Sequence, residues 1–361
     1  MAYTIDNTQP SGQSATGSTL NHAQIETSYV NAFRAGFEQA FQQTESKLQP
    51  YFEQETQNEE YQYFDRIGVA EDMQDATTRF GDNPNSNIEH DRRRIGLQDY
   101  ELGKYVDEKD LKRVLTDPMN AYTQALLASG KRKIDDIIID SLFGTAYTGK
   151  AGGTPVTFPV ASTAEGSSVV TVGRISKGNI VDSEAQYTVG AADTEGFSIG
   201  ASYGTADSGL TLSKLKAARA TMLRLEAISQ DDIVNCFITH RQVMDLLAIK
   251  EVINSDYATR AALAEGQVTT FMGFRFIQCE RLGLSTGTGG DERRCFVATP
   301  KALKFATGTA LKGDVWRVPA KKNIPYIYFK MCAGASRMWG EVFGEIRCNE
   351  ASAIGATVPT A

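Results

Sequence analysis

Residue types that often carry chemistry form no catalytic pattern in this sequence. The three histidines, His22, His90 and His240, lie far apart, and no HExxH, paired-cysteine or EF-hand spacing accompanies them. We therefore predict no catalytic residue, no metal site and no cofactor.

The glycine-rich run at residues 283–290 superficially resembles a phosphate-binding loop. It lacks the Lys-Ser/Thr ending of a P-loop, and the acids that follow, Asp291 and Glu292, would repel phosphate. We favour a loop between two strands and keep nucleotide use as an alternative.

Charged residues cluster at several places. Arg92, Arg93 and Arg94 are the densest basic group, and many acids surround them in sequence. We therefore favour pairing with acids of a neighbouring chain over contact with a phosphate backbone. Residues 131–133 (Lys-Arg-Lys) are interpreted as a solvated helix face, and the acid pairs at 135–136 and 231–232 as solvated carboxylates.

Composition excludes several classes of protein. The net charge of -7 and a pI near 5.2 suit a dedicated nucleic-acid binder poorly, because such a binder needs Lys and Arg to displace counterions. The sequence has no apolar run of 18 residues and no secretory signal at its N-terminus, so no membrane partner is expected. The cysteines are odd in number and widely spaced, which predicts reduced, buried thiols: Cys236, Cys279, Cys295, Cys332 and Cys348.

Extended elements come first along the chain. After a polar segment at residues 1–24, apolar side chains recur every fourth residue and predict a helix over 24–48: Ile25, Tyr29, Phe33, Phe37 and Phe41. Residues 61–115 are charged and predict a long β-hairpin around a polar turn. A two-stranded ribbon is marginally stable by itself, so this hairpin must bury surface elsewhere.

A long helix is predicted over residues 118–143, with Asp117 as its N-cap, Pro118 at its first position and Gly144 at its end. Residues 149–209 are rich in Gly, Ser and Thr and are interpreted as an inserted strand-and-turn module. Helices are then expected from 212 and over 241–249. Strands are expected at 233–238, 271–277, 295–298, 315–318, 326–330 and within 335–348. This order indicates an α+β fold.

At this point the sequence resembles a known family. Residues 211–350 resemble the second half of a tailed-bacteriophage major capsid protein of the Hong Kong 97-like fold. The segments that carry the resemblance are Leu212–Ala227, Asp232–Leu247, Gly266–Arg281, Cys295–Phe305 and Ile324–Arg347. The first half agrees with the family in the order of its elements.

The resemblance implies a domain organisation. It assigns 1–52 to an N-terminal arm with a helix and 53–116 to an extended loop (E-loop). The P domain, with its spine helix, comprises 117–148 and 315–361. The strand insertion takes 149–209, and the A domain takes 210–314.

The resemblance also implies a function in the virion capsid, assembled in the cytoplasm of the host bacterium. The subunit would form pentamers and hexamers of an icosahedral shell around double-stranded DNA. The implied partners are further copies, a portal protein, a possible cement protein and, since no propeptide precedes the arm, a separate scaffolding protein. Some relatives weld subunits through a lysine on the E-loop. Since no lysine lies between Lys47 and Lys104, contacts here are expected to be non-covalent.

The residues expected to make contacts between subunits lie on the hairpin and the arm: Tyr61, Tyr63, Phe64, Arg92, Arg93, Arg94, Ile95, Tyr29, Phe33 and Phe37. We expect the triple change of Arg92, Arg93 and Arg94 to alanine to fold normally and assemble poorly. The alternatives are an encapsulin-like compartment for protein cargo, a nucleotide-using enzyme, and a tail or adhesion protein.

Overall fold

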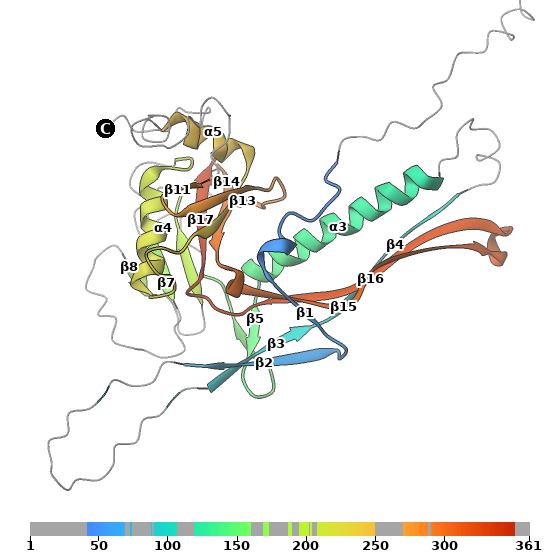
Figure 1. Cartoon of the computed structure of the whole chain (residues 1–361), viewed down its shortest axis with the longest axis horizontal. Coiled ribbons are helices and arrows are strands. Elements are labelled where there is room, and N and C mark those ends of the chain that lie inside the picture. Colours follow the sequence, from blue (N-terminus) through green and yellow to red (C-terminus); the bar gives the residue numbers. More distant parts are fainter. Residues whose placement is uncertain are drawn as a thin grey trace, which may run out of the picture.

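The structure is a computed structural model, and it describes residues 42–68, 73, 88, 90–106, 119–159, 169–172, 187–189, 195–201, 203, 208–249, 270–287 and 290–350. Three β-sheets and three α-helices make up this described part of the chain (Figure 1). The mixture confirms the α+β class.

The long helix α3 (Met119–Phe143) is the central support of the molecule. It agrees with the predicted helix over 118–143, although the predicted cap residues Asp117 and Pro118 lie outside the described residues. The helix ends where expected, since the Gly144 amide bonds the Asp140 carbonyl at 2.8 Å. Its C-terminal half is buried through apolar side chains of the predicted face: Ile134, Ile137, Ile138 and Leu142.

A four-stranded sheet runs along α3, in the order β1 (Glu53–Thr56), β15 (Leu303–Val318), β16 (Ile324–Arg337) and β4 (Gln98–Tyr105). The sequence assigned residues 98–105 to the returning arm of the hairpin, and that assignment is wrong. They pair with β16 from Tyr105↔Tyr326 to Gln98↔Ala333. Pairing beside α3 lets Val106, the residue after β4, pack on Ile327 and Phe329.

The hairpin itself consists of β2 (Tyr61–Ile67) and β3 (His90–Gly96). It is no isolated ribbon, because β3 also pairs with β5 (Ala146–Thr148), which pairs with β6 (Thr154–Val156). The third and fourth strands come from the chain just after α3, so the hairpin's base is fixed to the helix end. Figure 1 shows the hairpin below α3.

The third sheet has nine strands and forms the compact part of the molecule beside α4 (Leu212–Arg224) and α5 (His240–Ala248). Its order is β11 (Thr270–Phe271), β12 (Phe274–Gln278), β10 (Val234–Ile238), β14 (Gly290–Ala298), β17 (Phe343–Asn349), β9 (Gly196–Ile199), β7 (Val169–Val172) and β8 (Tyr187–Val189), with β13 (Leu284–Gly287) on β14. Short 3-10 turns are η1 (Gln49–Tyr51), η3 (Pro300–Ala302) and η4 (Pro319–Lys321).

Two predicted boundaries do not coincide with these sheets. The segment 149–209 is not a separate module, because β9 is parallel to β17 inside the nine-stranded sheet. The boundary at residue 315 falls inside β15, which is continuous from Leu303 to Val318. The first difference arises because β9 pairs with a strand far away in sequence, which composition does not reveal. The second arises because β15 pairs without a break across residue 315 with β16, the next strand along the chain.

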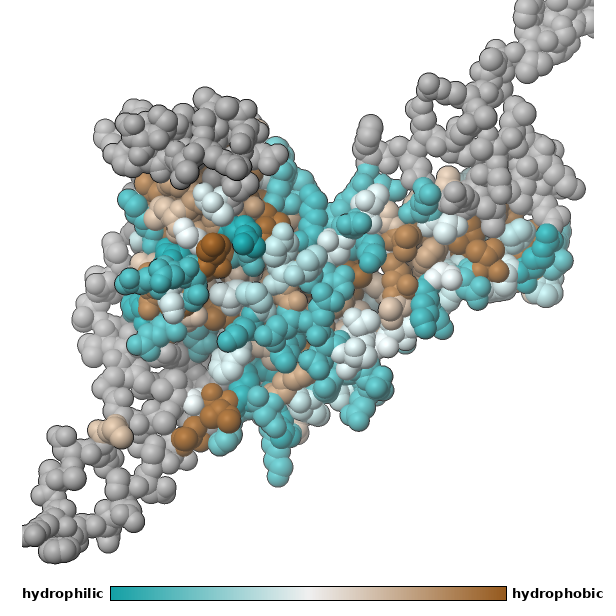
Figure 2. Space-filling view, in the orientation of Figure 1, coloured by the Kyte–Doolittle hydropathy of each residue, from teal (hydrophilic) through white to brown (hydrophobic). Residues whose placement is uncertain are grey.

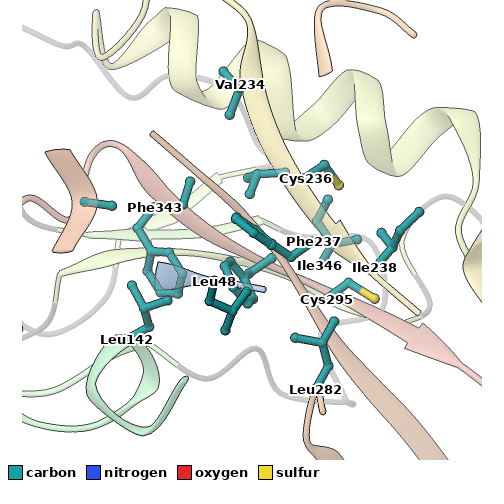
Figure 3. Packing of buried hydrophobic residues seen from close by; sticks show 14 of the residues in the cluster. Leu48, Leu142, Val234, Cys236, Phe237, Ile238, Leu282, Cys295, Phe343 and Ile346 are labelled. Carbon is teal, nitrogen blue, oxygen red and sulfur yellow. The ribbon is translucent and has the colours of Figure 1, made fainter. Parts of the chain in front are cut away.

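One apolar core joins the parts. Figure 3 shows Leu48 before η1 and Leu142 of α3 among strand residues that include Phe237, Cys295 and Phe343. Phe237 stacks on Phe296 with ring centroids 4.6 Å apart. The end of the arm, the helix and the nine-stranded sheet therefore share one interior.

Arg337 links this core to the helix end. Its buried guanidinium donates to the Leu142 carbonyl at 2.6 Å, the Gly144 carbonyl at 3.1 Å and the Val156 carbonyl at 3.2 Å. The last carbonyls of a helix lack partners within it and carry its negative dipole end, so a cation there stabilises the terminus. Burial lowers the Arg337 pKa to about 10.

The remaining sequence predictions had mixed outcomes. The helix expected over 24–48 is wrong for residues 42–48, which are irregular, while Tyr29, Phe33 and Phe37 lie outside the described residues. The five cysteines are unpaired, as predicted, and four are buried, whereas Cys332 is only half-buried. Burial raises the pKa of Cys236, which indicates an unreactive thiol. Within the described part of the chain, no helix is long and apolar enough to cross a membrane.

Candidate assembly surface

The β2–β3 hairpin has two faces of different character. Its register pairs Tyr63 with Arg94 and Phe64 with Arg93, and paired residues of antiparallel strands share a face. The outer face therefore carries Tyr61, Tyr63, Asp65, Ile67, Arg92 and Arg94. The inner face carries Gln62, Phe64, Arg66, Asp91, Arg93 and Ile95.

The outer face is an exposed layer of aromatic rings and guanidinium groups. Tyr61 and Tyr63 are 44% and 40% exposed. Arg94 lies 4.9 Å from the ring centre of Tyr61 and 4.7 Å from that of Tyr147. Arg92 stacks 5.7 Å over Tyr63 and bonds Asp65 at 2.8 Å. These stacks hold the side chains in place while leaving aromatic area open to a partner.

The turn between β5 and β6 lies against this layer. Gly152 has a φ of +61°, and a Cβ there would lie 2.8 Å from Arg94 and 2.9 Å from Tyr63. Glycine is therefore required both for the turn and for the close approach. The Tyr63 hydroxyl also donates to the Ala151 carbonyl at 3.4 Å.

The inner face is clamped to the rest of the same subunit. Arg93 is fully buried and forms an ion pair with Glu195, the residue before β9. Arg66 is buried too and contacts the same Glu195 at 3.2 Å, as well as Asp91 and the Met338 carbonyl. Two guanidinium groups from the hairpin thus converge on one carboxylate at the start of β9, a strand of the nine-stranded sheet.

The pKa shifts agree with this clamp. Burial lowers the pKa of Arg93, and the nearby Glu195 carboxylate acts against that effect. Burial acts to raise the pKa of Asp91, yet hydrogen bonds from Thr148 and Arg66 outweigh it and lower this pKa. The inner face therefore depends on charges that lie within one chain.

The structure separates the residues predicted to contact a neighbour. Arg93 and Ile95 are fully buried, and Phe64 packs beside Ile95 in a small apolar cluster with Ala306 and Met338. The view of the arginine run as one group pairing with another chain is therefore corrected for Arg93, which pairs within its own subunit. Strand alternation, a period of two, was the signal in the sequence that could have separated it from its neighbours.

Exposed apolar side chains lie where the described part of the hairpin ends. Ile67 is 61% exposed and Ile88 is 40% exposed. Figure 2 shows hydrophobic residues, in brown, gathered where the hairpin leaves the described residues, whereas the surface around it is mostly teal. Exposed apolar side chains beside an aromatic layer are typical of a protein-binding surface.

The glycine-rich run at 283–290 does not form a phosphate cradle. Its described residues belong to the β13–β14 hairpin, with Leu284 paired to Arg293 and Ser285 to Glu292. This agrees with the preferred prediction of a connection between two strands. A phosphate loop would instead lead from a strand into the N-terminus of a helix.

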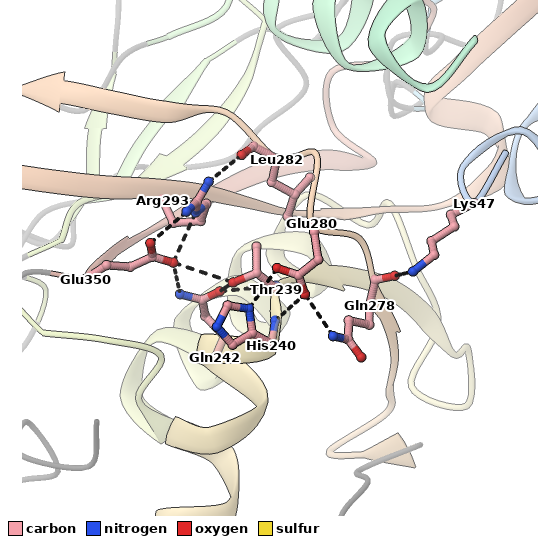
Figure 4. Close-up of polar contacts among 9 residues, drawn as sticks. All are labelled: Lys47, Thr239, His240, Gln242, Gln278, Glu280, Leu282, Arg293 and Glu350. Atoms are coloured by element: carbon pink, nitrogen blue, oxygen red, sulfur yellow. Dashed lines mark hydrogen bonds and ion pairs between the residues drawn. The ribbon is translucent and has the colours of Figure 1, made fainter. Parts of the chain in front are cut away.

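Polar residues near this hairpin fix α5 instead. Thr239 and Gln242 form a capping box at the start of α5, and Gln242 donates to Glu350 at 3.0 Å. Arg293 donates to both oxygens of Glu350, at 3.0 and 2.8 Å (Figure 4). On the other side, His240 contacts Glu280 at 2.8 Å. These contacts join α5 to strand ends, a structural role.

The predicted solvated acids behave differently from one another. Asp231 and Asp232 are exposed, as predicted. Asp136 is partly exposed and binds Arg281 through two hydrogen bonds of 2.7 and 2.6 Å. Asp135 is fully buried, so its prediction is wrong.

Comparison with known proteins supplies the family. The model of the family described as "Phage capsid protein" matches residues 25–350. No curated protein matches the chain.

Solved capsid structures share the fold. The capsid of cyanophage P-SCSP1u superposes with a TM-score of 0.60 at 15% identity, covering 96% of this chain and 100% of that one. The capsid of cyanophage Pam1 gives 0.58 at 15% identity, covering 89% and 96%. The capsid of Ralstonia phage GP4 gives 0.54 at 13% identity, covering 90% and 97%. The chain therefore belongs to the phage capsid protein family: it is a major capsid protein with the Hong Kong 97-like fold, a structural protein of the phage shell.

Proposed function

We propose that the outer face of the β2–β3 hairpin joins neighbouring subunits of the shell. Tyr61, Tyr63, Arg92 and Arg94 would lie against another copy, and the arm residues Tyr29, Phe33 and Phe37 would add a second contact. In this proposal the copies form pentamers and hexamers that enclose double-stranded DNA. The observation that carries it is the contrast between the clamped inner face and the exposed aromatic layer outside.

The chemistry of the outer face supports an interface with protein. Tyrosine and arginine are enriched where proteins meet, because they combine large contact area with hydrogen-bonding groups. A single exposed ion pair contributes only about 0–1 kcal/mol. A shell repeats each contact in many copies, and linked weak contacts sum to a stable assembly.

Non-covalent assembly follows from the composition of the loop. No lysine lies between Lys47 and Lys104, so no lysine of the hairpin is present to form a covalent link to a neighbour. We further propose that a separate scaffolding protein guides assembly in the host cytoplasm, and that a portal protein and a possible cement protein join the shell. The acidic chain, at -7, suits a wall that does not grip its DNA.

The sheets also suggest revised domains. We propose that α3 with the sheet β1–β15–β16–β4 is the P domain, and that the nine-stranded sheet with α4 and α5 is the A domain. The E-loop is then the β2–β3 hairpin alone.

The test changes the two tyrosines together, Tyr61→Ser and Tyr63→Ser. We expect the subunit to remain folded, by circular dichroism, and the yield of shells in sedimentation and electron microscopy to fall at least about tenfold, since each copy loses two aromatic contacts. The matched control is Tyr61→Phe with Tyr63→Phe, which keeps the rings and should assemble. Wild-type yield from the serine variant would contradict the proposed contact.

An encapsulin-like compartment remains the alternative within the same fold. Particles purified from cells distinguish the two, because a phage shell contains DNA after packaging and a cargo compartment contains protein. No contact described above favours a nucleotide-using enzyme or a tail protein.

A further inference from the structure

The carboxylate of Asp135, on α3, is buried against the end of the arm. It accepts hydrogen bonds from the Ser46 hydroxyl at 2.5 Å and from the Lys47 and Leu48 amides at 3.1 Å each, and the Gln43 side chain donates a fourth. A buried carboxylate is tolerated only when its oxygens are satisfied, and hydrogen bonds to an ionised group are about twice as strong as neutral ones.

A second side chain of α3 holds the residues just before this contact. One nitrogen of Arg132 donates to the Gln42 side chain at 2.8 Å and to the Gln43 carbonyl at 3.2 Å. Arg132 was predicted to be part of a solvated helix face. It instead lies one turn from Asp135, so the two charged residues hold the strap, residues 42–47, along the helix.

The residues after the strap are held by different forces. Leu48 is fully buried, and Phe52 stacks on Phe237 with centroids 5.9 Å apart. Apolar burial fixes residues 48–52 whether or not Asp135 is charged. The hydrogen bonds between the strap and α3 end on Asp135 and Arg132.

We infer that Asp135 is the positioning residue that fixes where the N-terminal arm, residues 1–41, leaves the subunit. Without its carboxylate, the first fixed residue shifts from Gln42 to Leu48, which adds about six residues, roughly 20 Å when extended, to the segment before the first fixed residue. The start of the predicted arm is then no longer held at one place on α3. The role in assembly rests on the proposed function, whereas the anchor itself does not.

The first test measures the anchor in the unassembled, full-length chain. A glutamate-specific protease cleaves after Glu45, which lies inside the strap, only when the strap detaches, because a protease needs several residues of free chain around the bond. We expect Asp135→Asn to increase the rate of cleavage after Glu45, read by mass spectrometry, about tenfold, as a charged acceptor is lost. The Lys47 and Leu48 amides should also exchange hydrogen faster.

The matched control is Asp136→Asn, which makes the same chemical change at the next residue of the same helix. Asp136 bonds Arg281 and not the strap, so cleavage after Glu45 should stay at the wild-type rate. A second variant, Gln43→Ala with Ser46→Ala, removes two donors without touching α3. It should increase cleavage even if Asp135→Asn fails to fold.

The second test measures positioning. Asp135→Asn should lower the yield of shells at least about threefold relative to Asp136→Asn, when both are folded. If Asp135→Asn folds, cleavage at the wild-type rate in this variant would overturn the proposed anchoring of the strap. If Asp135→Asn does not fold, cleavage at the wild-type rate in the double variant would overturn it. Faster cleavage with shells at full yield would overturn the positioning role. If the wild-type protein itself formed no shells, the proposed function would fail while the cleavage result still decided the anchor.

Discussion

The nine-stranded sheet and the β2–β3 hairpin satisfy their side chains in opposite ways. Every residue of β10 and β17 is buried, and the charged residues of β17 find partners within the sheet. Glu345, for example, accepts from Ser198 at 2.7 Å and pairs with Arg294 and Arg347. The hairpin alternates between buried and exposed positions, and only its inner face is satisfied in this manner. These strands of the sheet are satisfied within one subunit, whereas the outer face of the hairpin stays exposed and is available for contact with another subunit.

The three consecutive arginines of β3, Arg92, Arg93 and Arg94, show this contrast between adjacent positions of one strand. Arg93 is fully buried beside Glu195, while Arg92 and Arg94 stack on tyrosines of the outer face. A buried charge must keep its partner, and an exposed charge is mostly solvated. The same residue type therefore stabilises the fold at one position and is available for assembly at the next two.

The largest effect is expected from Arg93→Ala. Its loss leaves Glu195 short of a partner and removes packing at the hairpin's base, which should lower the free energy of unfolding by about 3 kcal/mol. Chemical denaturation of the unassembled subunit measures this value. A change below about 1 kcal/mol would show that the clamp is not what holds the hairpin.

A smaller effect on stability, with a larger one on assembly, is expected from Arg92→Ala with Arg94→Ala. Both guanidinium groups are partly solvated, so the free energy of unfolding should fall by less than about 1 kcal/mol. Shell yield should fall severalfold, because the aromatic layer loses the cations stacked on it. Assembly at full yield would mean that the outer face does not bind a neighbour. The triple alanine change, which includes Arg93, is now expected to impair folding as well.

The smallest effect is expected from pH. The pKa of Asp91 is lowered from 3.8 in the folded state, so its carboxylate stabilises the fold above pH 3.8 and this contribution is lost as the pH falls below that value. The melting temperature of Asp91→Asn should therefore lie below that of the wild type at pH 7, and the gap should narrow towards pH 3. A gap that is independent of pH would assign the Asp91 effect to packing instead of charge. Asp65→Asn, on the exposed outer face, is the control.

The parts of the fold that could be predicted are those with local causes. The helix over 119–143 was found because proline and glycine mark its limits and apolar residues recur on one face. The short strands Val169–Val172, Tyr187–Val189 and Gly196–Ile199 lie in the segment 149–209, which was predicted to contain strands and turns.

The parts that were missed have distant causes. Residues 98–105 leave the hairpin because β16, more than 200 residues later, offers a better partner than β2. Asp135 was assigned to solvent because no sequence pattern shows that residues 43–48 cover it. Arg93 was grouped with Arg92 and Arg94 because the alternation that places Arg93 inside was not applied to the arginine run.

The continuity of β16 has a mechanical consequence. The end of β16 leads directly into Met338, whose carbonyl accepts a hydrogen bond from Arg66 of the hairpin. Figure 1 shows the β2–β3 hairpin and the paired strands β15 and β16 extending to opposite sides of the molecule. A pull on the hairpin therefore loads β16 lengthwise, and its hydrogen bonds to β15 and β4 are strained in shear. Bonds in shear share the force and must break together, whereas bonds in a peeled hairpin break one after another. A wall built from such subunits would resist tension from within better than the modest energy of any single contact suggests.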